Sequence, residues 1–151
     1  MKNIIPLDIL EKLSFKKDKP VLGYKSDDKF KDINSETVRE NIFKIAKQLK
    51  SYSLNKTDKI GILLPNCPEW VYIDLASQLI GAIPVPIYYL SNITYVEYVI
   101  HHSDMKMLFI SNKDFLNCII PKLHYFPKLQ NIICLNIDID SKNIEIVKTF
   151  N

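Results

Sequence analysis

Glycine is scarce in this chain of 151 residues, where it occurs only as Gly23, Gly61 and Gly81. Loops that cradle a phosphate or expose a nucleophilic serine need closely spaced glycines, because side chains would hold the backbone away from the ligand. The sequence therefore contains no G-x-G-x-x-G dinucleotide loop, no P-loop and no G-x-S-x-G turn. We expect no cofactor-binding residue of these kinds in the chain.

Arginine and cysteine are also rare. Arg39 is the only arginine among 20 basic residues, which face 17 acidic ones and give a net charge of +3. Proteins that read nucleic acids use arginine forks and basic clusters, so this composition predicts no nucleic-acid partner. The three cysteines, Cys67, Cys118 and Cys134, are widely spaced and odd in number. They fit neither a disulfide framework nor a metal motif, and they favour a reduced, cytoplasmic setting.

Long apolar runs without polar interruption are missing as well. The most apolar window, 71–90, contains Asp74, Gln78, Gly81 and two prolines. We therefore interpret it as a buried helix followed by a buried strand, with no transmembrane segment. The N-terminus reaches Asp8 before any long apolar stretch, which is unlike a secretory signal peptide.

Imidazoles and carboxylates are too dispersed to predict a metal or acid–base site. His101 and His102 are adjacent, so on a helix their side chains would point about 100° apart, and His124 stands alone. Four carboxylates fall on separate expected elements, where helix capping or surface exposure is the simpler role: Asp58, Glu69, Asp74 and Asp104. We expect no catalytic residue and no metal ligand.

What the chain does have is an alternation of helix and strand signals. An amphipathic helix, capped by Asn34 or Ser35, is predicted from apolar side chains at offsets 0, 4, 7, 8 and 11: Val38, Ile42, Ile45, Ala46 and Leu49. Strands are then expected at 59–64, 82–88, 107–110 and 132–135, with helices from Pro68 to before Gly81, at 95–102 and at 114–123 between them. The pattern predicts a doubly wound, mostly parallel α/β sheet.

The two ends of the chain complete this division. A short helix at 6–13 and a small hairpin, 21–24 with 30–33, form an N-terminal extension, 1–33, ahead of the α/β part, 34–151. The last strand candidate, 144–147, is followed by no helix, which would leave exposed apolar surface that an independent domain buries. We therefore expect residues 1–151 to be one partial domain of a larger protein.

Four pieces of sequence, taken in order, resemble a known family. They are TDKIGILLPNCPEW at 57–70, IDLA at 73–76, GAIPVPIY at 81–88 and HSDMKMLFI at 102–110. Together they resemble the N-terminal region of the acyl-adenylate-forming, or AMP-binding, enzymes, and NCPEW followed by VPIY is most similar to the long-chain fatty acyl-CoA synthetases. The combination is far more specific than any one piece.

The resemblance implies that the parent protein is a long-chain fatty acid–CoA ligase. Such an enzyme uses ATP and Mg²⁺ to make an acyl-adenylate and then passes the acyl group to CoA. Nothing here matches the family's phosphate loop, nucleotide motifs or catalytic lysine, so the chain is expected to be an inactive scaffold whose partner is the rest of its own polypeptide. Trp70, Tyr88 and Tyr89 are the candidate acyl-pocket or interface contacts, although such aromatics are more often core. Peripheral membrane association and homodimerisation are left open.

One departure from the family concerns backbone conformation. Family members usually carry glycine where this chain has Ser53 and Thr57, and we expect Asn55 to supply the left-handed conformation instead.

Two other functions stay open. The chain could be a stand-alone α/β module that binds a partner or ligand, or part of a ligase for acyl carrier protein, acetate or aryl acids, which share the same N-terminal plan.

Overall fold

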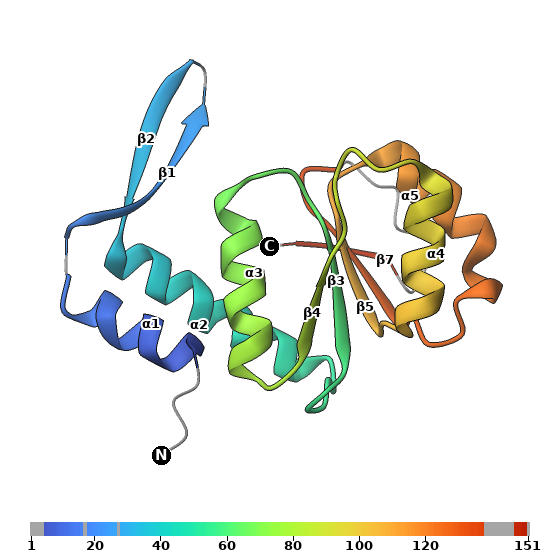
Figure 1. Ribbon diagram of the computed structural model, residues 1–151, viewed down its shortest axis with the longest axis horizontal. Helices are drawn as coiled ribbons and strands as arrows, with labels where there is room; N and C mark the ends of the chain where they lie inside the picture. The colour runs from blue at the N-terminus through green and yellow to red at the C-terminus, as the bar shows by residue number, and fades with distance from the viewer. Residues whose placement is uncertain (1–4, 17, 27, 138–146, 151) are drawn as a thin grey trace. The chain divides into compact units, whose positions relative to one another are not determined.

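The computed structural model describes residues 5–16, 18–26, 28–137 and 147–150 (Figure 1). The chain forms two compact units, one made of Met1–Lys56 with Asn66–Ala82 and the other of Thr57–Pro65 with Ile83–Asn151.

The first unit is a hairpin with three helices. Helix α1 spans Ile5–Ser14, strands β1 and β2 span Pro20–Ser26 and Lys29–Asn34, and helices α2 and α3 span Ser35–Ser51 and Pro68–Leu79. The two strands pair antiparallel, as the sequence predicts. Helix α2 contacts both α1 and α3, and all five apolar positions expected to face the core are buried: Val38, Ile42, Ile45, Ala46 and Leu49.

Asn34 and Ser35, the two residues expected as the N-cap of α2, both have a structural role. Asn34 is the N-cap, since its side chain accepts a hydrogen bond of 2.8 Å from the backbone N–H of Thr37. Ser35 is fully buried instead, and its hydroxyl donates to the carbonyl oxygen of Lys16 at 2.6 Å. The cap satisfies one of the free N–H groups of the first turn, while Ser35 ties α2 to the segment after α1.

Helix α3 confirms the expected start and end. Cys67 is the N-cap and Pro68 takes the first turn, where its missing N–H is not needed. Gly81 follows the last turn with φ of +82°, a conformation that glycine adopts without strain. The apolar window 71–90 is thus a helix and a strand, and no helix in the described ranges has the length and apolar character to cross a bilayer.

The second unit is a parallel sheet with helical crossovers. Its strands are β3 (Lys59–Leu63), β4 (Ile83–Pro86), β5 (Met107–Ile110), β6 (Asn131–Cys134) and β7 (Val147–Thr149). They lie in the order β4-β3-β5-β6-β7, and each neighbouring pair is parallel. Helix α4 (Ile93–Ser103) connects β4 to β5, and helix α5 (Lys113–Ile119) with the 3₁₀ helix η1 (Ile120–Tyr125) connects β5 to β6. The predicted parallel α/β architecture is confirmed.

Burial explains why these short strands are stable. Every residue of β5 and β6 is buried, as is typical of strands covered on both faces. Their apolar side chains join those of α4, α5 and the segment after η1 in one cluster that includes Val96, Leu108, Leu116, Phe126 and Ile132.

Two expected elements differ in the structure. The helix expected at 114–123 is α-helical only to Ile119 and continues as η1, because Pro121 has no N–H for the α-helical ladder. The strand expected at 82–88 is limited to Ile83–Pro86. Ile83 and Ile87 donate their N–H groups to the carbonyl oxygens of Asp58 and Ile62, before and in β3, so the missing N–H groups of Pro84 and Pro86 fall on the other side of β4, at the edge of the sheet, where proline is tolerated. Of the last strand candidate, 144–147, only Val147 is described, and it begins β7.

The expectation for the turn before β3 is wrong. Ser53 and Thr57 themselves adopt the left-handed conformation, with φ of 56° and 73°, whereas Asn55 is not among the described residues with positive φ. A β-branched residue in this region is strained because its Cβ crowds the backbone. The chain keeps the conformation that glycine would favour and places threonine there.

We expect Thr57→Gly to stabilise the protein by about 1 kcal/mol, since relief of left-handed strain exceeds the extra entropy that glycine loses on folding. The midpoint of thermal unfolding should rise by about 2–4 °C. Asn55→Gly is the matched control, and we expect no stabilisation from it because Asn55 has no left-handed strain to relieve. An unchanged or lower midpoint of thermal unfolding for Thr57→Gly would show that the left-handed conformation of Thr57 costs no stability.

Candidate functional site

The carboxyl edge of the parallel sheet is the first place to look for a ligand site. The chain runs from β3 to β4 on one side and then crosses to β5 on the other side of β3. Open α/β sheets bind ligands beyond the carboxyl ends of their strands at this reversal of direction. The four residues directly after β3, β4, β5 and β6 are Leu64, Ile87, Ser111 and Leu135. Three aliphatic side chains and one hydroxyl can neither transfer a proton near neutral pH nor coordinate a metal strongly.

Ser111 is the one unusual group at this edge. Its hydroxyl oxygen is buried without a hydrogen-bond partner among the described residues. The next residue, Asn112, is already used, because its side chain accepts a hydrogen bond of 3.0 Å from the N–H of Phe115 and caps α5. Of the four residues directly after the strands, Ser111 is thus the one with a polar side chain.

Two polar pairs of the unit lie at the opposite, amino edge of the sheet. Lys106, which precedes β5, approaches Asp58, which precedes β3, with 2.9 Å between Nζ and Oδ2. Lys148 donates a hydrogen bond of 2.8 Å to the side chain of Asn131. Because ligand sites in such sheets form at the other edge, these pairs are best explained as ties between neighbouring strands.

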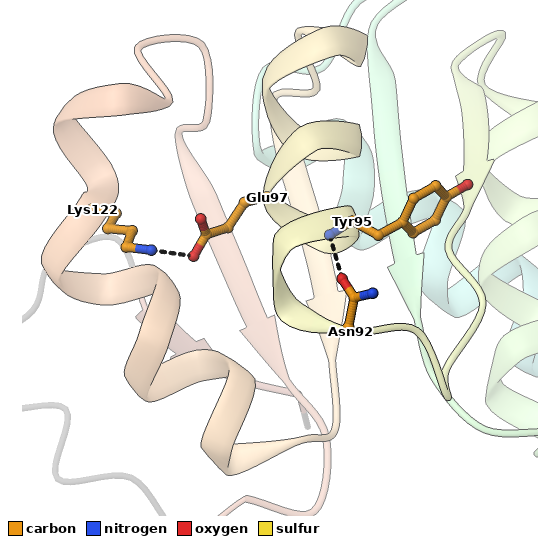
Figure 2. Close-up of polar contacts among 4 residues, drawn as sticks. All are labelled: Asn92, Tyr95, Glu97 and Lys122. Atoms are coloured by element: carbon orange, nitrogen blue, oxygen red, sulfur yellow. Dashed lines mark hydrogen bonds and ion pairs between the residues drawn. The ribbon is translucent and has the colours of Figure 1, made fainter.

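Helix α4 and the helix η1 are joined by a further pair at the surface. Figure 2 shows Lys122 of η1 directed at Glu97 of α4, with 2.6 Å between Nζ and Oε1. This hydrogen bond raises the pKa of Lys122 above its ordinary value. Asn92 caps α4 by accepting from the N–H of Tyr95, and the Tyr95 ring extends away from the ion pair. An exposed pair of this kind contributes little to stability.

Histidines and carboxylates do not gather into a metal site within the described ranges, where no group of three or more His, Cys, Asp or Glu could hold an ion. The ring of His102 stacks on Tyr98 with 5.3 Å between centroids, and the ring of His124 lies 4.0 Å from Tyr125. All three histidines are exposed. His102 and His124 thus make aromatic contacts on solvated helices.

The cysteines are free and differ in their surroundings. Cys118 is exposed, Cys67 is half-buried and Cys134 is buried. Burial, and then the charge of Glu69, raises the pKa of the Cys67 thiol, and burial raises the pKa of Cys134 from 9.0 to about 11. A nucleophilic cysteine needs a lowered pKa, so Cys67 and Cys134 are structural thiols.

The raised pKa of Cys134 predicts a loss of stability in alkali. The thiol stays protonated in the folded state while the unfolded chain ionises, so its contribution is fully present below about pH 9 and disappears as the pH rises to about 11. The loss should reach about 2–3 kcal/mol. Denaturant unfolding of the protein and of Cys134→Val between pH 8 and 11 measures it. If the free energy of unfolding fell equally with pH in both proteins, the thiol of Cys134 would not be the cause of the loss.

The three aromatic candidates lie in different units. Trp70 is half-buried in α3 of the first unit, and it lines a groove with a volume of about 500 Å³. Tyr88 and Tyr89 follow β4 in the second unit, where Tyr88 is 69% exposed and Tyr89 is half-buried. Their roles as acyl-pocket or interface contacts stay predictions. Sequence reasoning missed the hairpin residues of the groove, whose only signal is an aromatic, Phe30, in a lysine-rich strand.

Comparison with known proteins identifies the family of this chain. A family model described as AMP-binding enzyme matches residues 11–148. Fatty acyl-CoA synthetase A of Dictyostelium discoideum is 34% identical over 92 residues, which cover 61% of this chain and 14% of the relative. Long chain acyl-CoA synthetase 4 of Arabidopsis thaliana is 30% identical over 76 residues, covering 50% of this chain and 11% of the relative.

A solved structure supports the fold. The crystal structure of an anthranilate CoA ligase in complex with anthranoyl-AMP superposes with a TM-score of 0.79 at 22% identity, covering 91% of this chain and 26% of that chain. The present chain thus spans only a small part of the proteins that it matches. Since the family model covers most of the 151 residues, the chain belongs to the AMP-binding enzymes.

Proposed function

We propose that this chain is the N-terminal scaffold of an ATP-dependent acyl-CoA ligase for long-chain fatty acids, and that it has no ligase activity alone. The observation that carries the proposal is the carboxyl edge of the sheet, where Leu64, Ile87 and Leu135 stand at the strand ends. In this role the sheet holds elements from the rest of the polypeptide in register, and those elements supply the chemistry.

ATP and Mg²⁺ do not fit the residues at this edge. Magnesium in nucleotide sites is held by carboxylates together with phosphate oxygens, and no carboxylate directly follows β3, β4, β5 or β6. A phosphate would need clustered backbone N–H groups or cationic side chains. ATP, Mg²⁺ and CoA therefore belong, in this proposal, to the whole protein, together with its cytoplasmic setting and any homodimer or peripheral membrane contact.

The choice of a fatty acid rests on the relatives. Both curated relatives reported above are named as acyl-CoA synthetases, one for fatty acyl groups and one for long chains. An aryl acid is the second candidate, because the superposed structure is an anthranilate CoA ligase. Its 22% identity supports the fold alone, so the fatty acid is preferred.

A chimera tests the scaffold role. The matching segment of the Dictyostelium fatty acyl-CoA synthetase A is replaced by residues 1–151, and release of pyrophosphate from ATP is measured with fatty acids of several lengths and with anthranilate. We expect an active chimera with the fatty-acid preference of the parent enzyme, and no pyrophosphate release from the 151-residue chain alone. Activity of the isolated chain, or a folded chimera without activity, would contradict the proposal.

A further inference from the structure

Strand β4 lies at one end of the parallel sheet, with β3 as its neighbour among the described residues. Successive peptide groups of a strand point to opposite sides of it. Since Ile83 and Ile87 donate their N–H groups toward β3, the peptide groups of Pro84 and Pro86 point to the outer side. Along Ile83–Pro86 this outer edge therefore presents carbonyl oxygens but no N–H group.

The sequence around β4 is otherwise well suited to pairing with another strand. No Asp, Glu, Lys, Arg or His occurs from 75 to 96. Ile83, Val85 and Ile87 are β-branched, which strands favour. Short uncharged segments with high β-propensity and no proline are the signature of strands that pair between chains. The segment 82–90 meets this description except for its two prolines.

Apolar side chains in and after β4 are open to solvent. Ile83 is 44% exposed, Tyr88 69% and Leu90 75%, and burying such surface against another molecule is favourable. Proteins protect edge strands of this kind with charged side chains, β-bulges or proline. Strand β4 carries no charge, and its register with β3 is regular. Of these three devices, the prolines are therefore the one that β4 has.

We propose that Pro84 and Pro86 keep this protein from pairing with a second copy of itself through β4. In the pairing that they prevent, two β4 strands lie antiparallel about a two-fold axis near Val85, and position 84 of one copy faces position 86 of the other. The outward peptide groups at both positions would exchange hydrogen bonds in such a pair. With proline at both positions neither copy has a donor to offer. The inference goes beyond the proposed scaffold function and does not rest on it.

Replacing both prolines with threonine tests the proposal, because threonine restores the N–H groups, suits a strand and is polar. Self-association of the 151-residue protein is measured by sedimentation equilibrium, and infrared amide I spectra report antiparallel pairing. We expect Pro84→Thr/Pro86→Thr to associate about tenfold or more tightly than the unchanged protein, because each new hydrogen bond contributes to affinity. Pro86→Thr alone restores one N–H group in each copy, and its association constant should lie between the two.

Pro127→Thr is the matched control, because Pro127 is exposed and lies outside the sheet. We expect it to associate like the unchanged protein. Adding Ile83→Lys to the double variant should reverse the gain, since lysine on an edge strand opposes pairing. Circular dichroism checks that each variant folds, and Pro86→Thr decides the question if the double variant does not fold.

Three results would overturn the proposal. One is a folded proline variant that associates no more tightly than the unchanged protein. Another is an equal gain in Pro127→Thr, and the third is a gain that survives Ile83→Lys, because the contact would then not involve β4. The chimera experiment measures the ligase function separately, and none of these outcomes affects it.

Discussion

Gly61→Ala is expected to destabilise the second unit by about 1–3 kcal/mol, although alanine normally suits a strand better than glycine. Gly61 is buried in β3 and is paired in register with Leu108 of β5. An added Cβ would collide with the sulfur of Met105 and lie 2.9 Å from Cδ1 of Leu108. Both neighbours are almost fully buried, so neither can move without disturbing the packed core. Gly61→Val should cost more still, to the point of preventing folding.

Denaturant unfolding followed by circular dichroism measures the effect, with Gly23→Ala as the control. A Cβ at Gly23 would lie 3.5 Å from the Asp32 carboxylate, which is an ordinary contact, so we expect a change within about 0.5 kcal/mol. A double mutant, Gly61→Ala with Met105→Ala, should be less destabilised than the sum of the two single changes, because the space opened at Met105 receives the new methyl group. Strict additivity, or a harmless Gly61→Ala, would contradict the close packing.

The helices and strands of this protein could be predicted from sequence because their signals are local. The apolar stripe of α2, the proline that begins α3 and the glycine that follows it all act within a few residues. The strand order could not be derived this way. Parallel strands pair across crossovers, and nothing within β3 specifies that β4 and β5 become its two neighbours.

Backbone strain at Thr57 could not be predicted, because intrinsic preference argues against it. Sequence reasoning assigned the left-handed conformation to Asn55, which tolerates it best, whereas the structure places it at Ser53 and Thr57. Residue preference within the turn therefore does not decide where the positive φ falls. Strain of this kind persists only when the surroundings determine the conformation.

The candidate site was only half visible in the sequence. NCPEW pointed to Trp70 through the family resemblance, and the structure places Trp70 on a groove. The opposite wall comes from a hairpin about 40 residues earlier in the chain, as the numbers of Phe30 and Trp70 show. A lone phenylalanine among lysines gives no periodic signal, so only the fold reveals that the hairpin and the start of α3 line the same groove.

Phe109→Ala is expected to destabilise the protein by about 3–5 kcal/mol. This is the largest loss that we expect from a substitution that introduces no backbone strain. Phe109 is 2% exposed in β5, and its ring meets Phe150 edge to face, with 5.9 Å between centroids and 78° between planes. Phe150 is half-buried and follows β7, and its N–H donates to the carbonyl oxygen of Cys134 at 2.9 Å. The aromatic pair therefore ties the last described strand to the centre of the sheet.

Phe150→Ala is the matched control, because it removes the same ring contact but less buried area, and we expect it to cost about 1–2 kcal/mol. A double-mutant cycle in denaturant unfolding should give a coupling of about 0.5–1.5 kcal/mol between the two rings. A coupling near zero would mean that β7 is not held by this contact, and equal costs for the two single changes would contradict the deep burial of Phe109. A clear coupling would show that β7 belongs to the folded sheet.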